Sequence, residues 1–533
     1  MTAVTYPRRL HELAVEEPHA RALTVVDPDG RTNSWTRVEL DEWAAAMARA
    51  LQASGVTPES LVVLAVPNGA ELVICAYASW WVGACVFPLS TKLVEAEQRE
   101  VLAAAAESGR HVVVVAAPGV HIDEDSQHRV RVLRLEKLIA ASTSMATEPL
   151  TAPDDDLVPF PGRAMPSGGS TGRPKIIVDT RPLAADADVT SPLRELMGRG
   201  PGEVILVVGP GYHALPFNWI FSGLFERGHV VLMTRFDAKA ALDAIEAHRV
   251  EALATVPIHL SRMAREPDID SRDLSSVVHL YHSGASCPDW LKRRWLDLVG
   301  AEHVYEGYGS AEAVGMVFIR GDEWLEHPGS VGRGMLTDVL VREPGGDAAP
   351  TGEVGEIFMR WRSAEGSTGS SLQGATYRYW GTEVPDAPEG YVSVGDLGWL
   401  DEDGYLFIAD RRLDLIISGG VNVYPAEVEA ALSGHVDVAD VAVIGLPDPE
   451  WGQRVHAIVL PRNPPSDPQQ LVCEFDRFAR ERLSAAKLPR SYEIVCALPR
   501  SDAGKIRRSA LVAERLESPP STVYVPGKKD ARK

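Results

Sequence analysis

The stretch Pro166-Ser-Gly-Gly-Ser-Thr-Gly-Arg-Pro-Lys175 combines glycines and hydroxyl side chains and ends in a lysine. Glycine lets backbone N–H groups crowd around an anion, hydroxyls can donate to phosphate oxygens, and Lys175 adds a compact positive charge. A flexible Ser/Gly linker is the alternative. The stretch leads directly into the β-branched run Ile176-Ile-Val178, however, which is typical of a strand. The pattern therefore indicates a polyphosphate-binding loop, although its spacing is not that of a P-loop.

Predicted strands and helices alternate on both sides of this loop. Such alternation predicts a mostly parallel sheet covered by helices. Short strands with Pro/Gly turns follow in residues 332–361, and they predict a small β-subdomain. Residues 117–155 show no clear periodicity and are expected to form irregular surface. The strands are expected at residues 61–66, 84–87, 111–116, 203–208, 229–233, 252–256 and 277–281.

The chain of 533 residues is too long for one hydrophobic core, so two or more domains are expected. We predict an N-terminal domain over residues 1–410 and a compact α+β domain over residues 411–518, with the boundary near Asp410-Arg411-Arg412. Residues 519–533 are expected to be a disordered tail.

Composition excludes several classes of function. The net charge of −21 argues against a nucleic-acid partner or an anionic membrane surface. The five cysteines have no C-x-x-C spacing, which favours a reducing compartment and no metal cage. The uncharged segment 72–89 is broken by Gly83 and Pro88, so no membrane span is expected, and the N-terminus has no apolar signal core. We therefore expect a cytoplasmic protein.

Three further motifs carry chemistry. Val304-Tyr-Glu-Gly-Tyr-Gly-Ser-Ala-Glu312 ends a predicted strand; its Tyr308 could stack on a base and its Glu312 could bind Mg²⁺, a cation that prefers oxygen ligands. A capping glutamate in a strand–turn–helix is the alternative. Asp396, in a Gly-Asp-x-Gly context, could accept two hydrogen bonds from a ribose. Lys505 follows a turn near the C-terminus, in Leu498-Pro-Arg-Ser-Asp-Ala-Gly-Lys505.

Together, and in this order, these motifs resemble the adenylate-forming (AMP-binding) superfamily, which includes acyl- and aryl-CoA synthetases, luciferases and peptide-synthetase adenylation domains. The resemblance spans roughly residues 10–515. It implies an α/β fold with a large N-terminal domain of several subdomains, built of layered βα sheets and a small β-barrel-like subdomain. A small mobile α+β C-terminal domain would follow. It also implies ATP, Mg²⁺ and CoA as cofactors and a carboxylic acid as substrate.

The resemblance also assigns roles to residues of the nucleotide site. Lys505, Lys175, Glu312 and His213 would be catalytic, and Glu312 would hold the metal. Tyr308 would stack on adenine, with Glu306 at the adenine edge, while Asp396 and Arg411 would hold the ribose. The full ATP/AMP-binding set would be Ser167, Gly168, Gly169, Ser170, Thr171, Gly172, Lys175, Ser283, Gly284, Ala285, Ser286, Glu306, Gly307, Tyr308, Gly309, Ser310, Asp396, Ile408, Arg411 and Lys505.

The resemblance also implies a hinge, a CoA tunnel and an acyl pocket. The implied hinge for rotation of the C-terminal domain is Arg412, Leu413 and Asp414. The implied CoA tunnel contains His213, Ser418, Gly419, Gly420 and Val421. The implied acyl pocket contains His213, Phe217, Asn218, Trp219, Tyr281, His282, Tyr305, Gly307, Val314 and Met316.

Four positions depart from the family pattern. Gly168 stands where a hydroxyl residue is common, and Ala311 replaces the usual threonine, so one donor to the α-phosphate is absent. Ser310 or water could replace that hydroxyl. Leu413 occupies the usual hinge position of an aspartate or lysine, and Asp410 replaces the glycine before Arg411.

The function implied is an ATP-dependent acyl-CoA ligase. It would activate a bulky apolar carboxylic acid as acyl-AMP, release pyrophosphate, and transfer the acyl group to the thiol of CoA. The Gly-Gly-Ser-Thr-Gly loop and Asn218-Trp219 resemble bile-acid–CoA-ligase-like members, which favours a polycyclic acid. Two alternatives stay open: a stand-alone enzyme that loads a separate carrier protein, and a non-catalytic nucleotide-binding member. Whether the chain forms a homodimer is also open.

Overall fold

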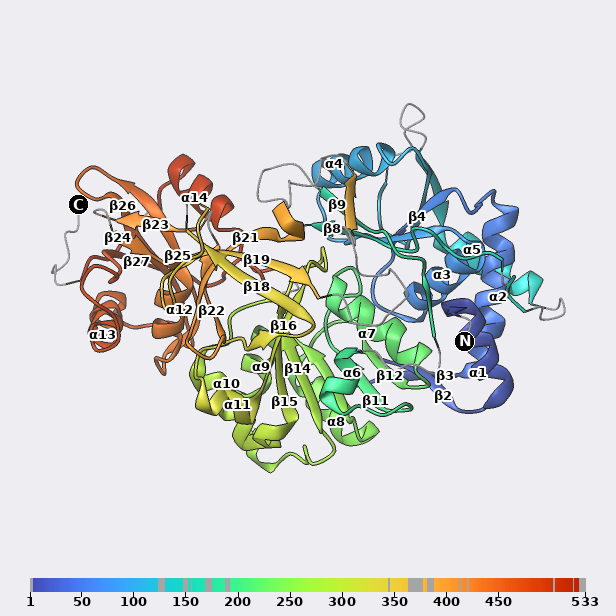
Figure 1. Cartoon of the computed structure of the whole chain (residues 1–533), viewed down its shortest axis with the longest axis horizontal. Coiled ribbons are helices and arrows are strands. Elements are labelled where there is room, and N and C mark those ends of the chain that lie inside the picture. The colour runs from blue at the N-terminus through green and yellow to red at the C-terminus, as the bar shows by residue number, and fades with distance from the viewer. Residues whose placement is uncertain are drawn as a thin grey trace.

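The computed structural model describes most of the chain in one continuous architecture (Figure 1). The described residues are 3–122, 130–146, 152–154, 156–167, 175–186, 192–343, 346–362, 377–380, 388–411, 414–418, 421–501, 504–520 and 522–526.

A mixed sheet of nine strands forms the centre of the N-terminal region. Its order is β17-β16-β15-β14-β13-β11-β12-β2-β3. The strands from β15 to β2 run parallel, so their carboxyl ends lie at one edge of the sheet. The bounds are β2 Arg21–Val26, β3 Thr32–Thr36, β11 Val204–Val207, β12 His229–Met233, β13 Ala252–Thr255, β14 His279–Ser283, β15 Val304–Gly309, β16 Met316–Arg320 and β17 Arg333–Gly334.

A second layer contains a parallel four-stranded sheet of order β5-β4-β6-β7. The three-stranded antiparallel sheet β20-β9-β8 contacts it through a bridge between Val86 and Arg163. The bounds are β4 Ser60–Ala65, β5 Cys85–Pro88, β6 His111–Ala116, β7 Val130–Arg134, β8 Ala164–Ser167, β9 Lys175–Asp179 and β20 Tyr377–Trp380. The short strands β1 Val4–Thr5 and β10 Ala184–Ala185 pair with each other.

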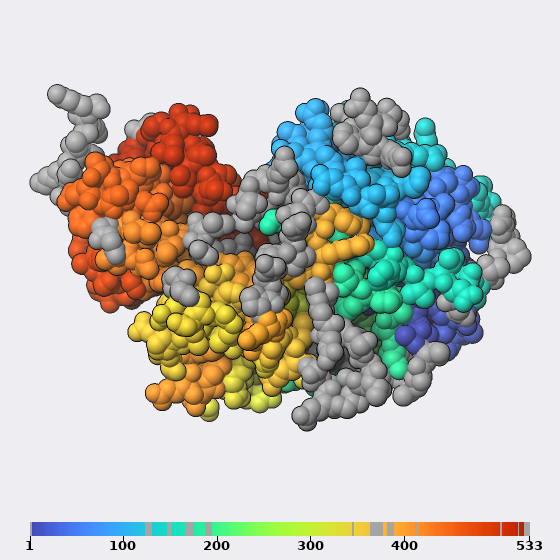
Figure 2. Space-filling model, turned by 45° about the horizontal axis from the view of Figure 1, so that its top comes forward, coloured from blue at the N-terminus to red at the C-terminus, as the bar shows by residue number. Residues whose placement is uncertain are grey.

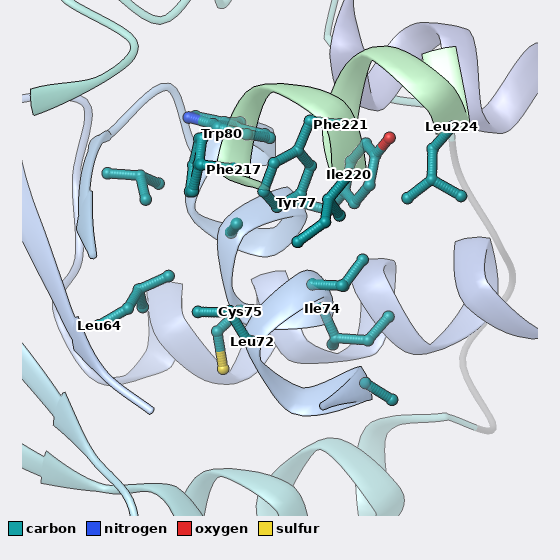
Figure 3. Packing of buried hydrophobic residues seen from close by; sticks show 14 of the residues in the cluster. Leu64, Leu72, Ile74, Cys75, Tyr77, Trp80, Phe217, Ile220, Phe221 and Leu224 are labelled. Carbon is teal, nitrogen blue, oxygen red and sulfur yellow. The ribbon is translucent and has the colours of Figure 1, made fainter. Parts of the chain in front are cut away.

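Helices fill the space between the two layers. Helix α3, Ala70–Trp81, is apolar on almost every side because it is buried between other elements. Its Tyr77 and Trp80 meet Phe217 and Phe221 of α7, Ala214–Phe225, in edge-on aromatic contacts (Figure 3). The uncharged segment that could suggest a membrane span is therefore a core helix and the buried strand β5. Among the described residues, no helix is long and apolar enough to cross a membrane.

The remaining helices of the N-terminal region cover the sheets. Helix α2 begins earlier than its apolar stripe suggests, because Thr36 and Glu39 form a capping box. The bounds are α1 Tyr6–Glu16, α2 Arg37–Ala53, α4 Glu95–Ala106, α5 Leu135–Met145, α6 Pro192–Met197, α8 Ala238–His248, α9 Pro257–Met263, α10 Asp289–Val299 and α11 Gly321–Glu326.

The expectation of irregular surface over residues 117–155 is wrong for much of that segment. Residues 130–134 form β7, which pairs in parallel with β6, and α5 follows it directly. Leu135 and Leu138 of α5 are buried in the main core. The arginines at 131 and 134 obscure the pattern in the sequence, because their side chains bond backbone carbonyls at the rim.

An antiparallel sheet of order β18-β19-β21-β22 forms the expected small β-subdomain. Its bounds are β18 Thr337–Arg342, β19 Gly355–Trp361, β21 Val392–Leu400 and β22 Leu406–Arg411. The Gly/Ser-rich segment 363–376 lies outside the described residues.

The C-terminal elements form a lobe beside this sheet (Figures 1 and 2). They have two hydrophobic clusters of their own. Tyr524 exchanges two backbone hydrogen bonds with Tyr492, so residues 522–526 differ from the expected disordered tail. The bounds are β23 Ile416–Ser418, β24 Val421–Val423, α12 Pro425–Ser433, β25 Val438–Asp448, β26 Gly452–Pro461, α13 Pro468–Arg480, β27 Ser491–Ile494 and α14 Arg508–Glu517.

Candidate active site

The glycine-rich stretch connects two paired strands. β8 and β9 are antiparallel, and their register places Ser167 opposite Lys175. The stretch is therefore the loop of a hairpin, with Lys175 as the first residue of the returning strand. Residues Gly168, Gly169, Ser170, Thr171 and Gly172 lie outside the described residues, so their predicted role in ATP binding stays a prediction.

Two loops of the predicted nucleotide site emerge from one edge of the central sheet. β13, β14 and β15 are parallel neighbours, so the residues after each strand lie side by side. Residues 283–286 end β14 and continue from it, with Gly284 at φ +85°. Residues 309–312 follow in the same way from β15. The fold thus brings together segments that the sequence separates.

Lys175 and Glu312 meet at one aromatic ring. The hydroxyl of Tyr379 donates a hydrogen bond of 2.9 Å to Glu312 Oε1. The ammonium of Lys175 lies over the same ring, 5.4 Å from its centroid. Burial, together with the neighbouring carboxylate of Glu312, raises the pKa of Tyr379 well above its usual value. Its hydroxyl therefore stays protonated and acts as the donor.

Tyr308 and Asp396, the predicted adenine and ribose residues, are direct partners. Tyr308 Oη donates to Asp396 Oδ2 over 2.7 Å. The β21–β22 register places Arg411 opposite Asp396. Ile408 lies on the same strand as Arg411 and packs against the hydrophobic cluster of this subdomain.

Ser310 has a buried hydroxyl for which the described residues offer no hydrogen-bond partner. A buried hydroxyl without a partner is costly, and ligand oxygens could satisfy it. The loop beyond it is shaped by Ala313, which has φ +52° and whose carbonyl accepts from Trp361 Nε1 at 2.6 Å. Ser310 thus offers a buried hydroxyl donor in the same loop as Ala311, which has none.

The donor set around Glu312 fits Mg²⁺. Among the described residues, no lysine or arginine forms a salt bridge with Glu312, so none of these side chains neutralises its charge. The described part of the chain also contains no group of three or more His, Cys, Asp or Glu side chains suited to a metal. Mg²⁺ is commonly bound by one or two carboxylates together with substrate phosphates, and such a site needs no protein cage.

Glu306, predicted at the adenine edge, takes part in a buried ion pair. Lys292 Nζ of α10 donates to Glu306 Oε2 over 2.8 Å and lies 3.0 Å from His282 Nε2. Lys292 is 1% exposed, His282 0% and Glu306 6%. Burial and the adjacent ammonium lower the pKa of His282 well below its usual value. Since successive side chains of a strand alternate between faces, His282 and its register partner Glu306 lie on the opposite face of the sheet from Tyr281 and Tyr305.

Aromatic members of the predicted acyl pocket do come together. Trp219 stacks on Tyr281 with ring centroids 5.5 Å apart, and Tyr305 packs against Phe318 at 5.6 Å. A Cβ on Gly307 would lie 2.0 Å from Tyr281 Oη, so only glycine permits this approach. Phe217 belongs to the same core but turns toward Trp80 of α3.

The other predicted pocket residues are spread around this cluster. Asn218 is exposed, and its amide oxygen accepts from Arg163. Val314 packs in the β-subdomain cluster, whereas the backbone of Met316 is bonded to Thr337 and Met335.

His213 is the N-cap residue of helix α7 and is held by its backbone. Its N–H donates to the Pro210 carbonyl at 3.1 Å, and its ring lies 4.6 Å from that of Tyr212. The preceding turn is clamped by Asn68, which accepts from Gly211 N and donates to Gly209 O. Sequence reasoning missed Asn68; the only signal is its place in a Pro-Asn-Gly turn before α3.

The turn that carries Lys505 contacts the N-terminal region. Gly504 has φ +73°, and a Cβ there would lie 2.5 Å from Ile258 Cγ2, in the helix that follows β13. Arg507 forms an ion pair of 2.8 Å with Glu97 of α4. Lys505 thus stands on the side of the molecule that carries the loops after β13, β14 and β15.

The predicted hinge is joined to the C-terminal lobe by Arg508. Its guanidinium contacts Asp414 at 2.8 Å, Glu429 at 2.9 Å and Asp410 at 3.9 Å. Burial opposes its charge, but these carboxylates outweigh burial and raise the pKa of Arg508 above its usual range. Asp410 also accepts from Ala426 N at the start of α12. Arg412 and Leu413 lie outside the described residues.

The predicted thiol tunnel is described only in part. Ser418 is buried at the end of β23, and Val421 is exposed at the start of β24. Gly419 and Gly420 between them lie outside the described residues.

Known proteins resemble this chain over nearly its whole length. Residues 10–364 match the family model "AMP-binding enzyme", and residues 427–505 match "AMP-binding enzyme C-terminal domain". A feruloyl-CoA synthase of Amycolatopsis sp is 33% identical over 92% of this chain and 94% of its own length. A 2-succinylbenzoate–CoA ligase of Bacillus licheniformis is 29% identical over 89% and 94%.

Solved structures agree with this match. The o-succinylbenzoate CoA synthetase of Bacillus subtilis, in complex with its acyl-adenylate intermediate, superposes with a TM-score of 0.76 at 25% identity. The superposition covers 96% of this chain and 98% of that one.

Proposed function

The chain belongs to the family of AMP-binding enzymes, and we propose that it is an ATP-dependent acyl-CoA ligase. It joins a carboxylic acid to AMP with release of pyrophosphate and then transfers the acyl group to the thiol of CoA with release of AMP. The observation that supports this most is the meeting of Lys175 and Glu312 at the Tyr379 ring. The hydrogen bond between Tyr308 and Asp396 adds to it. Relatives over 89% or more of the chain are named as CoA ligases.

The first half-reaction needs charge stabilisation more than covalent help. The acid carboxylate attacks the α-phosphorus of ATP, and the bond from that phosphorus to the pyrophosphate oxygen breaks. Lys175 and Lys505 stabilise the negative charge on the phosphate oxygens, and the buried hydroxyl of Ser310 donates to one of them. Mg²⁺ held by Glu312 would add further positive charge at the phosphates.

The nucleotide is placed by the pair Tyr308 and Asp396. Asp396 accepts from the ribose hydroxyls, Arg411 lies opposite it, and the Tyr308 ring stacks on adenine. The hydrogen bond from Tyr308 fixes the carboxylate before ATP arrives, which reduces the entropy lost on binding.

The second half-reaction requires Lys505 to leave. The C-terminal lobe rotates about residues 412–414 and presents Ser418 and Val421, with Gly419 and Gly420 between them, to the thiol tunnel beside His213. Arg508 links Asp410 and Asp414 to Glu429, so it couples the hinge to the lobe.

The acid binds beside Gly307. Aromatic side chains gather there, since Trp219 stacks on Tyr281 and Tyr305 is the register partner of Tyr281 on the neighbouring strand, which suits an aromatic acid. A bulky polycyclic acid remains part of the proposal. A panel of hydroxycinnamic, succinylbenzoic, indoleacetic, bile and long-chain fatty acids, followed by pyrophosphate release, identifies the class.

Transfer to a carrier protein is the second candidate function. It is favoured by one relative, a fatty acid–[acyl-carrier-protein] ligase of Streptomyces coeruleorubidus, 30% identical over 77% of this chain. Acid-dependent pyrophosphate release without consumption of CoA would support it. A non-catalytic binding role predicts no release with any acid.

Lys505→Ala tests the two-step scheme. We expect ATP–pyrophosphate exchange to fall by about 10²–10³-fold, because a charge-stabilising contact is removed from the transition state. Preformed acyl-adenylate should still react with CoA at nearly the wild-type rate. Arg482→Ala, which removes an exposed cation of the same lobe, serves as the control. Equal loss of both half-reactions in Lys505→Ala would contradict the scheme.

Location and assembly complete the proposal. We place the enzyme in the cytoplasm, on the basis of its acidic composition and unpaired cysteines. Sedimentation at several concentrations distinguishes a monomer from a homodimer.

A further inference from the structure

Tyr379 lies where the phosphate loop returns to the sheet. It belongs to β20, which pairs antiparallel with β9 and places Tyr379 opposite Ile177. Lys175 is the first residue of β9, so Tyr379 is close to the end of the phosphate loop. Glu312 reaches the same point from the loop after β15. Tyr379 therefore stands between two segments that both approach the phosphates.

The hydroxyl and the ring of Tyr379 make different contacts. Its hydroxyl donates to Glu312 Oε1 at 2.9 Å, and its face lies beneath Lys175 Nζ at 5.4 Å. The ring of Tyr377 packs against it edge-on, with centroids 5.2 Å apart and an interplanar angle of 71°. Tyr377 is buried, so the orientation of Tyr379 is set by packing as well as by hydrogen bonding.

A tyrosine at this position can orient Glu312 without neutralising its charge, which a cationic side chain could not do. A lysine or arginine bonded to Glu312 would neutralise the charge that attracts a divalent cation. The neutral hydroxyl fixes one oxygen of the carboxylate and leaves its negative charge in place. The ring face also attracts the ammonium of Lys175. Among the described residues, Lys175 and Glu312 form no salt bridge with each other.

We propose that Tyr379 is a positioning residue for nucleotide activation: its hydroxyl orients Glu312 for the divalent cation, and its ring keeps Lys175 available for phosphate instead of for Glu312. This inference rests on the proposed function. Tyr379 touches neither the acid nor the reacting phosphorus in this scheme, and it acts through Glu312 and Lys175.

Tyr379→Phe tests the hydroxyl, because it keeps the ring and the packing. We expect the affinity of the enzyme–ATP complex for Mn²⁺, measured by electron paramagnetic resonance without any acid, to fall by about 10–100-fold. ATP affinity without metal should stay within twofold of wild type. High Mg²⁺ should restore most of the pyrophosphate exchange. Unchanged Mn²⁺ affinity would overturn the proposal, and so would an equal loss of ATP affinity with and without metal.

Tyr405→Phe is a matched control. Tyr405 donates to Glu323 Oε1 over 2.6 Å, which is also a tyrosine–glutamate bond but lies away from the nucleotide site. We expect no change in Mn²⁺ affinity. A loss as large as that in Tyr379→Phe would show that deletion of any such hydroxyl loosens the fold, and the proposal would fail.

Tyr379→Leu tests the ring. It frees Lys175 to pair with Glu312, so ATP affinity without metal should fall further than in Tyr379→Phe; equal affinities would remove the ring from the proposal. Wild-type enzyme that releases no pyrophosphate with any acid would refute the proposed function. The Mn²⁺ comparison of the variants does not depend on that result.

Discussion

Glu306 and Glu312 lie six residues apart in the sequence, yet their environments are opposite. Glu306 is buried against Lys292, with His282 beside the same ammonium. Glu312 receives its hydrogen bond from the neutral hydroxyl of Tyr379. A cation neutralises a carboxylate, whereas a hydroxyl only orients it. A carboxylate that is paired with a cation inside the protein is therefore less able to attract a metal ion than one that accepts a hydrogen bond only from a neutral hydroxyl.

The same distinction holds elsewhere in the molecule. Asp396 is bonded by the hydroxyl of Tyr308, in the predicted ribose site. Glu429 is bonded by the guanidinium of Arg508, in the connection between hinge and lobe. At these four carboxylates the tyrosine donors lie in the predicted nucleotide site and the cationic donors lie outside it, although Tyr405, which donates to Glu323, shows that a tyrosine donor alone does not identify a site.

The largest effect is expected from breaking the buried ion pair. Lys292→Met leaves Glu306 buried without its cation, which should lower the free energy of unfolding by about 3–5 kcal/mol. Urea denaturation measures this. The double variant Lys292→Met/Glu306→Gln should recover most of the loss, because no unpaired charge remains. Arg293→Met, an exposed neighbour on α10, should change stability by only about 0.5 kcal/mol. Equal losses in Lys292→Met and Arg293→Met would contradict the structural role.

Substitution of Glu312 is expected to lower activity and to leave stability almost unchanged. Glu312→Gln keeps an oxygen that can accept from Tyr379, so the free energy of unfolding should change by less than about 1 kcal/mol. Removal of the charge should lower ATP–pyrophosphate exchange by about 10²–10³-fold and weaken nucleotide binding in Mg²⁺. A variant with unchanged exchange and unchanged ATP affinity would exclude Glu312 as the metal residue.

The smallest effect concerns His282 and pH. Its pKa is well below the usual 6.5 in the folded protein, because it is buried beside Lys292. The unfolded chain therefore binds a proton below about pH 6.5 that the folded chain does not, and stability falls as the pH is lowered. The slope from this one group is at most about 1.4 kcal/mol per pH unit. His282→Gln should flatten the stability profile between pH 6 and 5; an unchanged slope would contradict this assignment.

Much of the α/β framework could be predicted from local patterns. The strands at residues 111–116 and 229–233 and the helix at residues 238–248 have the bounds that their apolar runs indicate. Strand β7 was missed because its arginines hide the pairing with β6, which supplies the missing burial. The periodicity of apolar residues predicts a buried face only where one face of the helix or strand is clearly apolar.

The sequence by itself was enough to predict the family, because the motifs that contain Lys175, Glu312, Asp396 and Lys505 are recognised by their residue types and by their order along the chain. The hydrogen-bond partner of each carboxylate could be identified only from the tertiary structure. Tyr379 is 67 residues from Glu312 along the chain, and no local pattern connects them. Their contact arises because β20 pairs with β9 while the loop after β15 reaches the same edge. Hydrogen-bond partners depend on distances between elements, and those distances are set by packing.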